Sequence, residues 1–168
     1  MSLGRGLGAL MGFLSFLFPG RVGAVEILVE NSEGAQYPTI QAAIDVAADG
    51  DEVVVAAGTY TGSFTFSGKN ILVRAQGELG SVRVDLGCNT EQPIRMSGGV
   101  SPELRDIVID GFCDPPVVDL PLRMSVTGGG TVRRVFVRGG SFVGTVALSP
   151  EDQTIIVRDL IVEGLLQD

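Results

Sequence analysis

The sequence predicts an all-β fold, a parallel β-solenoid of a few coils that opens with one short α-helix. Three observations lead to this prediction. A strand pattern that starts at Leu104 recurs at Val132 and again at Val157, glycine is abundant, and helical periodicity is confined to one segment near the start. Strands that repeat at such a period without intervening helices are typical of coils that stack through parallel strands.

The predicted helix covers about residues 39 to 49. Thr39 follows Pro38 and is a suitable N-cap residue, and Gly50 supplies a left-handed stop. One narrow apolar stripe is formed by residues at i, i+3, i+4 and i+7, namely Ile40, Ala43, Ile44 and Ala47. Such a helix is suited to cover the open end of a stack of strands. The apolar run from Val53 to Ala57 then predicts a strand that is buried on one or both faces.

The helix and the first strands carry a resemblance to a known family. The string TIQAAIDVAADGDEVVVAAGTYTG, followed by GKNILVRAQG, resembles the N-terminal opening of secreted right-handed parallel β-helix proteins of the pectate lyase-like (pectin lyase-fold) superfamily. In that family the helix caps the first coil and the GTY turn leads into it. One departure is Ala57, where the family usually has proline. The resemblance implies a fold rather than an activity, because the superfamily includes lyases, hydrolases, epimerases and adhesins.

Residues 1–24 are interpreted as a secretory signal peptide. One cation, Arg5, precedes the apolar run from Leu7 to Phe18, and small residues occupy the −3 and −1 positions before Val25. The run is short for a transmembrane span, although an uncleaved membrane anchor is the alternative. Cleavage would leave residues 25–168 as one β-helix domain, and the expected location is secreted, periplasmic or at the cell surface.

The charge of the chain restricts its partners. A net charge of −8 argues against a nucleic-acid partner, which would need a basic face. The acidic balance favours solubility or contact with cations over binding of polyanions such as pectate. No other apolar segment is long enough to span a membrane, so no stable span is expected after signal cleavage.

Repeated strand patterns predict the stacking of the coils. Residues 104–111 (LRDIVIDG) match residues 132–139 (VRRVFVRG) at an offset of 28, and residues 157–164 (VRDLIVEG) follow at a further offset of 25. The offset of 28 also superposes two further segment pairs: 94–97 (IRMS) on 122–125 (LRMS), and 117–120 (VVDL) on 145–148 (TVAL).

Alternation within these strands predicts which side chains point inward. The inward set is Ile107, Ile109, Val135, Val137, Leu160 and Val162. Two outward columns alternate in charge from coil to coil, one of Asp106, Arg134 and Asp159 and one of Asp110, Arg138 and Glu163. They are interpreted as solvated ladders rather than catalytic groups. An outward apolar stripe of Val108, Phe136 and Ile161 is either covered by a partner or a missing segment, or left exposed.

Few residues suggest chemistry. The chain has no His, which excludes His-based acid–base catalysis and His metal ligands. It also has no Trp. Asp85 in VRVDL and Asp119 in VVDL, which hold matching places in the two strings, are the weak candidates for a catalytic pair or a calcium site, with Arg83 beside them. The family resemblance adds that lyases of the superfamily bind calcium with acidic clusters and use a cationic base, while its hydrolases use several Asp. The alternative is two independent surface aspartates.

Cys88 and Cys113 are the two cysteines of the chain, and each follows a predicted strand. In an exported protein a disulfide between them is chemically allowed, and neighbouring coils would place them within range. Two buried thiols are the alternative.

The predicted function is a structural or surface-binding module, including carbohydrate binding, without a complete catalytic site. The first alternative is a polysaccharide lyase or glycoside hydrolase, or a fragment of one, that acts on acidic or cell-wall polysaccharide through Asp85 and Asp119. The second is an adhesin or fibre segment that associates with another chain at an open C-terminal coil. Since no cap follows the last repeated strand, we expect the solenoid to be truncated at its C-terminus.

Overall fold

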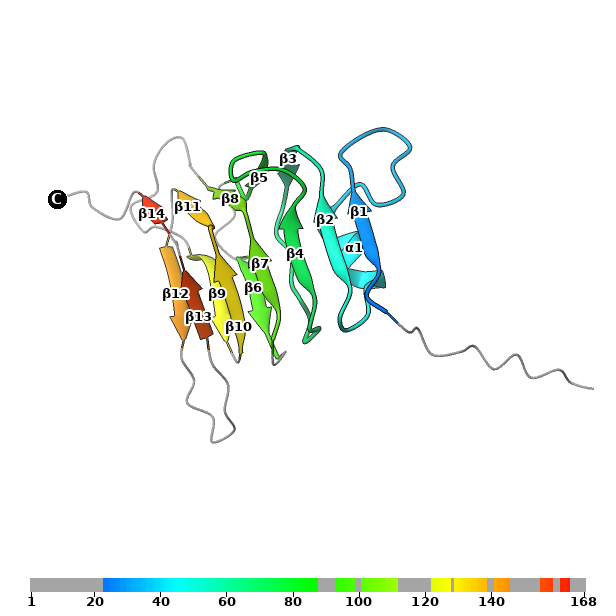
Figure 1. The fold of residues 1–168 in the computed structure, drawn as a ribbon. Coiled ribbons are helices and arrows are strands. Elements are labelled where there is room, and N and C mark those ends of the chain that lie inside the picture. Colours follow the sequence, from blue (N-terminus) through cyan, green and yellow to red (C-terminus); the bar gives the residue numbers. More distant parts are fainter. Residues whose placement is uncertain are drawn as a thin grey trace, which may run out of the picture.

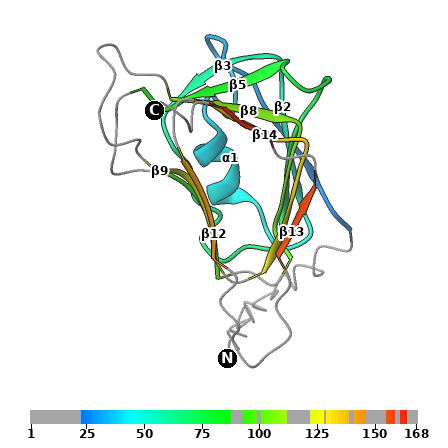
Figure 2. The ribbon, with the colours of Figure 1, turned by 90° about the vertical axis from the view of Figure 1, so that its left-hand side faces the viewer.

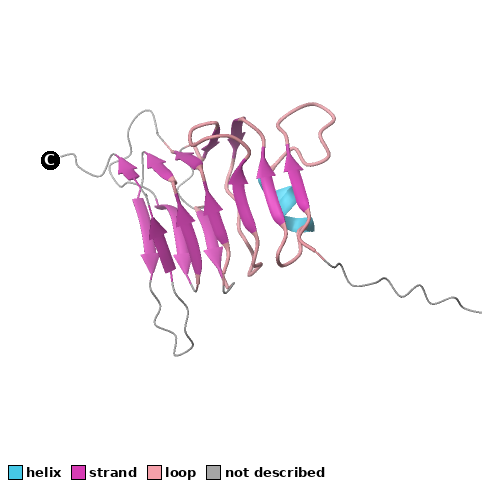
Figure 3. Cartoon of the chain, in the orientation of Figure 1, coloured by secondary structure: helices cyan, strands magenta, loops and turns pink. Residues whose placement is uncertain are grey.

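The computed structural model describes residues 23–87, 93–98, 101–111, 122–127, 129–138, 141–145, 155–158 and 161–163. In these residues the chain forms a β-solenoid of about four turns, in which every paired strand is parallel to its neighbour. The coils follow one another from right to left in Figure 1, and Figure 3 shows the same arrangement by element type. The predicted fold class is therefore confirmed.

Three sheets form the walls of the solenoid (Figure 2). Sheet A contains, in spatial order, β1 (Glu26–Val29), β2 (Glu52–Val55), β4 (Leu72–Ala75), β7 (Glu103–Arg105), β10 (Gly130–Arg133) and β13 (Ile155–Arg158). Sheet B contains β3 (Gly58–Thr61), β5 (Val82–Asp85), β8 (Ile107–Asp110), β11 (Phe136–Arg138) and β14 (Ile161–Glu163). Sheet C contains β6 (Ile94–Ser97), β9 (Leu122–Thr127) and β12 (Ser141–Thr145).

Helix α1 (Ile40–Val46) lies across the interior at the N-terminal end of the solenoid, as the view along the axis shows (Figure 2). The predicted stripe is buried, and all four of its residues belong to the hydrophobic core. Thr39 is the N-cap, and its hydroxyl oxygen accepts a hydrogen bond from the backbone N–H of Ala42 at 3.2 Å. The helix therefore covers the end of the core, as its single apolar face predicted.

The helix ends earlier than predicted. Ala47 already has an extended backbone, and the next N–H, that of Ala48, donates to the side chain of Asp51 at 2.8 Å. The ammonium of Lys69 binds the last helical carbonyls, those of Ile44 and Asp45, at 2.7 and 2.8 Å. Gly50 does adopt a left-handed φ of 88°, but it lies in the turn after the helix rather than at its end. The polar groups at the end of the helix are thus bound by the side chains of Asp51 and Lys69, and Gly50 is not the residue at which the helix stops.

The register confirms two of the predicted offsets and corrects a third. Leu104 pairs with Val132, and Val132 pairs with Val157, as the two matches between coils predicted. In sheet C, however, Ile94 pairs with Met124 rather than with the predicted Leu122. A shift of two positions keeps the same side chains on the inner face, so the sequence alternation could not distinguish the two registers. The pair 117–120 and 145–148 lies outside the described residues, apart from residue 145.

The inward set is confirmed where its side chains are described: Ile107, Ile109, Val135 and Val137 are fully buried. The outward apolar stripe is less exposed than predicted, because Val108 is buried and Phe136 is half-buried. Asp106 departs further from the prediction. It lies between β7 and β8 with a left-handed φ of 63°, and it is buried rather than solvated.

Candidate functional site

The outer face of sheet B carries a group of charged side chains, Arg83, Asp85, Asp110 and Arg138, which we call the charged face. Arg83 and Asp85 alternate in β5 with the buried Val82 and Val84, so both point away from the core. Asp110 and Arg138 occupy equivalent positions on β8 and β11. Two of the residues predicted as site candidates therefore lie on one surface.

The register fixes which charges are neighbours. Asp85 pairs with Asp110, and Asp110 pairs with Arg138. Adjacent strands lie about 4.8 Å apart, so two carboxylates and one guanidinium follow one another along the solenoid axis. The position beside Asp85 is thus held by Asp110 and not by Asp119, which lies outside the described residues.

Asp110 is bound by arginine from both sides. Arg138 Nη2 donates to Asp110 Oδ2 at 2.6 Å, and Arg83 Nη1 lies 3.4 Å from the same oxygen. The Asp110 side chain is only 14% exposed, whereas that of Arg83 is 50% exposed. Asp110 Oδ1 is buried and has no hydrogen-bond partner among the described residues. Asp110 is therefore the partly buried centre of the charged face, and Arg83 forms its accessible edge.

Asp85 has a different environment. It is exposed, and its Oδ1 accepts a hydrogen bond from the N–H of Gly87 at 2.8 Å in the turn that follows β5. The exposed Asp85 side chain is the register neighbour of Asp110. The two carboxylates thus differ, since one is ion-paired and shielded while the other is open.

A second Asp–Arg pair lies at the corner between sheets A and B. Arg134 binds both carboxylate oxygens of Asp106, with Nη2 to Oδ2 at 2.6 Å. Asp106 is 5% exposed, and the Arg134 side chain is half-exposed. The predicted attraction between charges in neighbouring coils is therefore confirmed for Asp106 with Arg134 and for Asp110 with Arg138, although the acidic members are shielded rather than solvated.

Metal ligands do not gather in the described residues, where no group of three or more Cys, Asp or Glu side chains is placed to hold a metal ion. On the charged face, Asp85 and Asp110 supply two neighbouring carboxylates. Cys88 and Cys113 lie outside the described residues, so the predicted disulfide stays a prediction.

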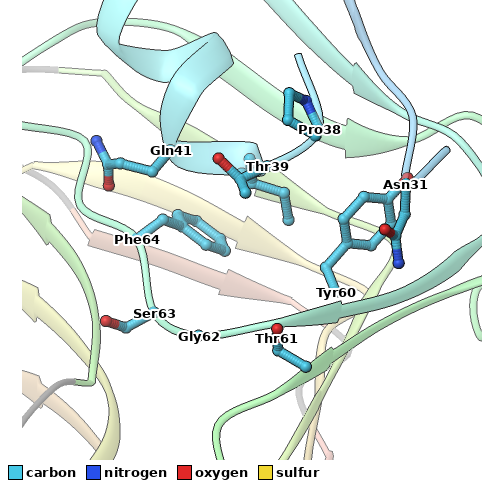
Figure 4. A pocket seen from close by; sticks show the side chains of 10 residues that line it. Asn31, Pro38, Thr39, Gln41, Tyr60, Thr61, Gly62, Ser63 and Phe64 are labelled. Atoms are coloured by element: carbon cyan, nitrogen blue, oxygen red, sulfur yellow. The ribbon is translucent and has the colours of Figure 1, made fainter. Parts of the chain in front are cut away.

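A cavity of about 340 Å³ lies between the start of α1 and the segment that leaves β3 (Figure 4). None of the ten residues that line it is charged: they are Asn31, Pro38, Thr39, Ile40, Gln41, Tyr60, Thr61, Gly62, Ser63 and Phe64. Its wall is held by Gln41, whose side-chain oxygen accepts from the N–H of Thr65 at 2.8 Å.

Tyr60 forms the floor of this cavity and is almost fully buried. Its hydroxyl donates to the carbonyl oxygen of Ala56 at 2.9 Å and also lies 3.2 Å from that of Val29. Burial raises the pKa of Tyr60, with a smaller contribution in the same direction from the charge of Glu30 and an opposing one from Asn31. Because its hydroxyl is used by the backbone, Tyr60 stabilises the first coil and is poorly placed to bind a ligand.

The role of Asp110 was missed from the sequence, where it was assigned to a surface ladder. A signal was present, because residues 82–88 (VRVDLGC) align without a gap on residues 107–113 (IVIDGFC), with two aliphatic positions, the aspartate and the cysteine in common. This alignment is the one in which Asp85 pairs with Asp110. The similar string VVDL at residues 117–120 predicts Asp119 as the neighbour of Asp85 instead.

In the part of the chain that the structure describes, no helix is long and apolar enough to cross a membrane. No protein-family profile, curated protein sequence or solved structure matches this chain significantly.

Proposed function

We propose that the chain is a secreted β-solenoid module that binds a polysaccharide or a similar surface polymer through the charged face of sheet B, without catalysis. The observation that supports this most is the ion pairing of the Asp110 carboxylate. Its carboxylate is held between Arg83 and Arg138, and both guanidinium groups would compete for it with any substrate.

The chemistry of the charged face suits polymer binding. Guanidinium and carboxylate groups offer several hydrogen-bond donors and acceptors in fixed planes, which match the hydroxyl groups of a sugar chain. Phe136 is half-buried beside Val108 in the next column and offers an apolar surface for a sugar ring. The columns run along the solenoid axis, so an extended polymer would meet equivalent groups from successive coils.

Arg83→Ala tests this proposal, because Arg83 is the most accessible cation of the charged face. Affinity electrophoresis in gels that contain neutral or acidic polysaccharides should show retardation of the wild type, at least a threefold loss of apparent affinity in Arg83→Ala, and no loss in Arg105→Ala. Arg105 is a matched control because it lies on sheet A and pairs with Glu103 of its own strand. The proposal would be refuted if Arg83→Ala and Arg105→Ala were retarded equally, or if no polysaccharide retarded the wild type.

A polysaccharide lyase or glycoside hydrolase is the second candidate, and the register of Asp85 beside Asp110 favours it. Retaining glycosidases use two neighbouring carboxyl groups for catalysis. A calcium ion bound between Asp85 and Asp110 would relieve the repulsion between their charges. The test is product release from a polysaccharide panel by the wild type, Asp85→Asn and Asp119→Asn, with calcium or with a chelator. Product release by the wild type that is lost in Asp85→Asn would support the enzyme and refute the binding module.

A further inference from the structure

The backbone N–H of Val25 donates a hydrogen bond to Asp51 Oδ1 at 2.9 Å. Asp51 is only 2% exposed, and its other oxygen accepts from the N–H of Ala48 at 2.8 Å. This buried carboxylate therefore ties the start of β1 to the end of α1. Val25 is also linked to sheet A, because its carbonyl oxygen accepts from the N–H of Glu52 at 2.9 Å.

Val25 also follows the bond at which the sequence predicts signal-peptide cleavage. Gly23 and Ala24 are exposed and lie outside any strand, whereas Val25 is partly buried and packs against the core. The boundary between exposed chain and folded domain therefore coincides with the predicted cleavage point. These are independent observations, since one concerns small residues in the sequence and the other concerns the position of a buried carboxylate.

We propose that the Ala24–Val25 bond is a processing site, and that cleavage there creates an α-ammonium group on Val25 that forms an ion pair with the buried carboxylate of Asp51. The inference rests on the proposed secretion of the chain. The step is a hydrolysis by a signal peptidase, in which water supplies the oxygen of the new carboxylate on Ala24 and the hydrogen of the new amine on Val25. The amine then takes up a further proton from solvent.

Cleavage changes the charge at a fixed position. Before it, Asp51 accepts a hydrogen bond from a neutral amide, and after it the same nitrogen carries a positive charge 2.9 Å from the carboxylate oxygen. Hydrogen bonds between ionised partners are markedly stronger than those of a neutral amide, and more so in a shielded environment. A cut one residue earlier or later would displace the amine by about 3.5 Å, beyond the reach of Asp51.

The carboxylates on the elements around Val25 favour a protonated amine, whereas the cations Arg74 on β4 and Lys69 at the end of α1 oppose it. Glu26 on β1 and Glu52 on β2 are register neighbours, and Glu52 is already paired with Arg74. Asp49, in the turn before β2, binds the backbone N–H of Asn70. All three carboxylates favour a protonated amine, although Asp51 is the one in contact with its nitrogen.

The first experiment expresses the full chain with a C-terminal tag in a bacterium that exports proteins, and identifies the N-terminal residue of the product by mass spectrometry. Val25 as the first residue supports the inference. An exported product that starts at any other residue overturns this inference and leaves the proposed secretion intact. A chain retained inside the cell with residues 1–24 attached overturns both.

The second experiment measures the pKa of the Val25 amine in the exported product from the pH dependence of its reaction with acetic anhydride, in the native state and in urea. An ion pair raises the pKa of an amine, whereas burial without a partner lowers it. We expect a native pKa at least one unit above that of the unfolded chain, and hence close to tenfold less free amine at neutral pH. An equal or lower native value overturns the ion pair. Asp51→Asn should abolish the difference and Asp49→Asn should keep it, while the wild-type comparison stands even where Asp51→Asn fails to fold.

Discussion

Replacing Asp106 with alanine should lower the free energy of unfolding by about 2 kcal/mol, since hydrogen bonds to charged groups contribute about 1.5–3 kcal/mol. The change removes the two-point ion pair with Arg134, in which the carboxylate is 5% exposed and the guanidinium is half-exposed. We expect the lower part of this range, because the freed guanidinium of Arg134 is rehydrated.

The backbone at this corner allows a sharper test. Asp106 has a φ of 63° and Arg134, in the next coil, a φ of 47°. A left-handed conformation costs a residue with a Cβ roughly 1–2 kcal/mol, and glycine avoids that strain. Asp106→Gly should therefore be about 1 kcal/mol less destabilising than Asp106→Ala, although both lose the same ion pair.

The assay is urea unfolding of the full chain, followed by circular dichroism, for wild type, Asp106→Ala, Asp106→Gly, Arg134→Ala and the double alanine variant. The double variant should be less destabilised than the sum of the single ones, because each single change already removes the pair. Arg105→Ala serves as a control and should stay within about 0.5 kcal/mol of wild type. A neutral Asp106→Ala, or a glycine variant as unstable as the alanine one, would refute this account of the corner.

Three further predictions concern the core, a buried phenol and the cysteines. Phe66→Ala should destabilise the domain by about 3–5 kcal/mol in urea unfolding, and Phe136→Ala by clearly less, because Phe66 is fully buried and Phe136 only half-buried. Because the pKa of Tyr60 is raised in the folded state, its phenol contributes fully to the free energy of unfolding below about pH 10, the pKa of an unfolded tyrosine. That contribution is lost as the pH rises through the pKa of the folded state, and urea unfolding at alkaline pH should show that Tyr60→Phe removes this loss. The offset of Cys88 and Cys113 equals that of Asp85 and Asp110, so exported protein should carry a disulfide, detected as a mass two hydrogens below the reduced chain, and free thiols would contradict it.

The fold could be predicted largely because its signals are local and repeated. The helix stripe that ends in Ala47 and the inward positions such as Ile107 and Val135 follow from periodicity alone, and all of them are buried. The register of sheet C could not be predicted, because Ile94 alternates equally well against Leu122 and Met124. Similarity between two four-residue strings is therefore weaker evidence for strand register than the eight-residue match that covers strands of sheets A and B.

The candidate site was predicted only in part. Arg83 and Asp85 lie on the charged face, but pairing with Asp110 depends on the register between coils and not on the residues around either aspartate. Asp51 gave no signal, because it lies in a run of acidic and glycine residues that is typical of an exposed turn. Its burial follows from contacts with Val25, which is distant in the sequence, and no local pattern contains them.

The unequal offsets of the repeat show that the length of the solenoid axis and the perimeter of each coil are set independently. The coil from Leu104 to Val132 is longer in sequence than the coil from Val132 to Val157, yet both advance the chain by one strand spacing, because both keep their strands in parallel register. The number of coils therefore determines how long the solenoid is, and the number of residues in a coil determines only how much its perimeter bulges. An engineer could thus add loop residues for display without lengthening the axis, or add whole coils to lengthen it in steps of about 4.8 Å.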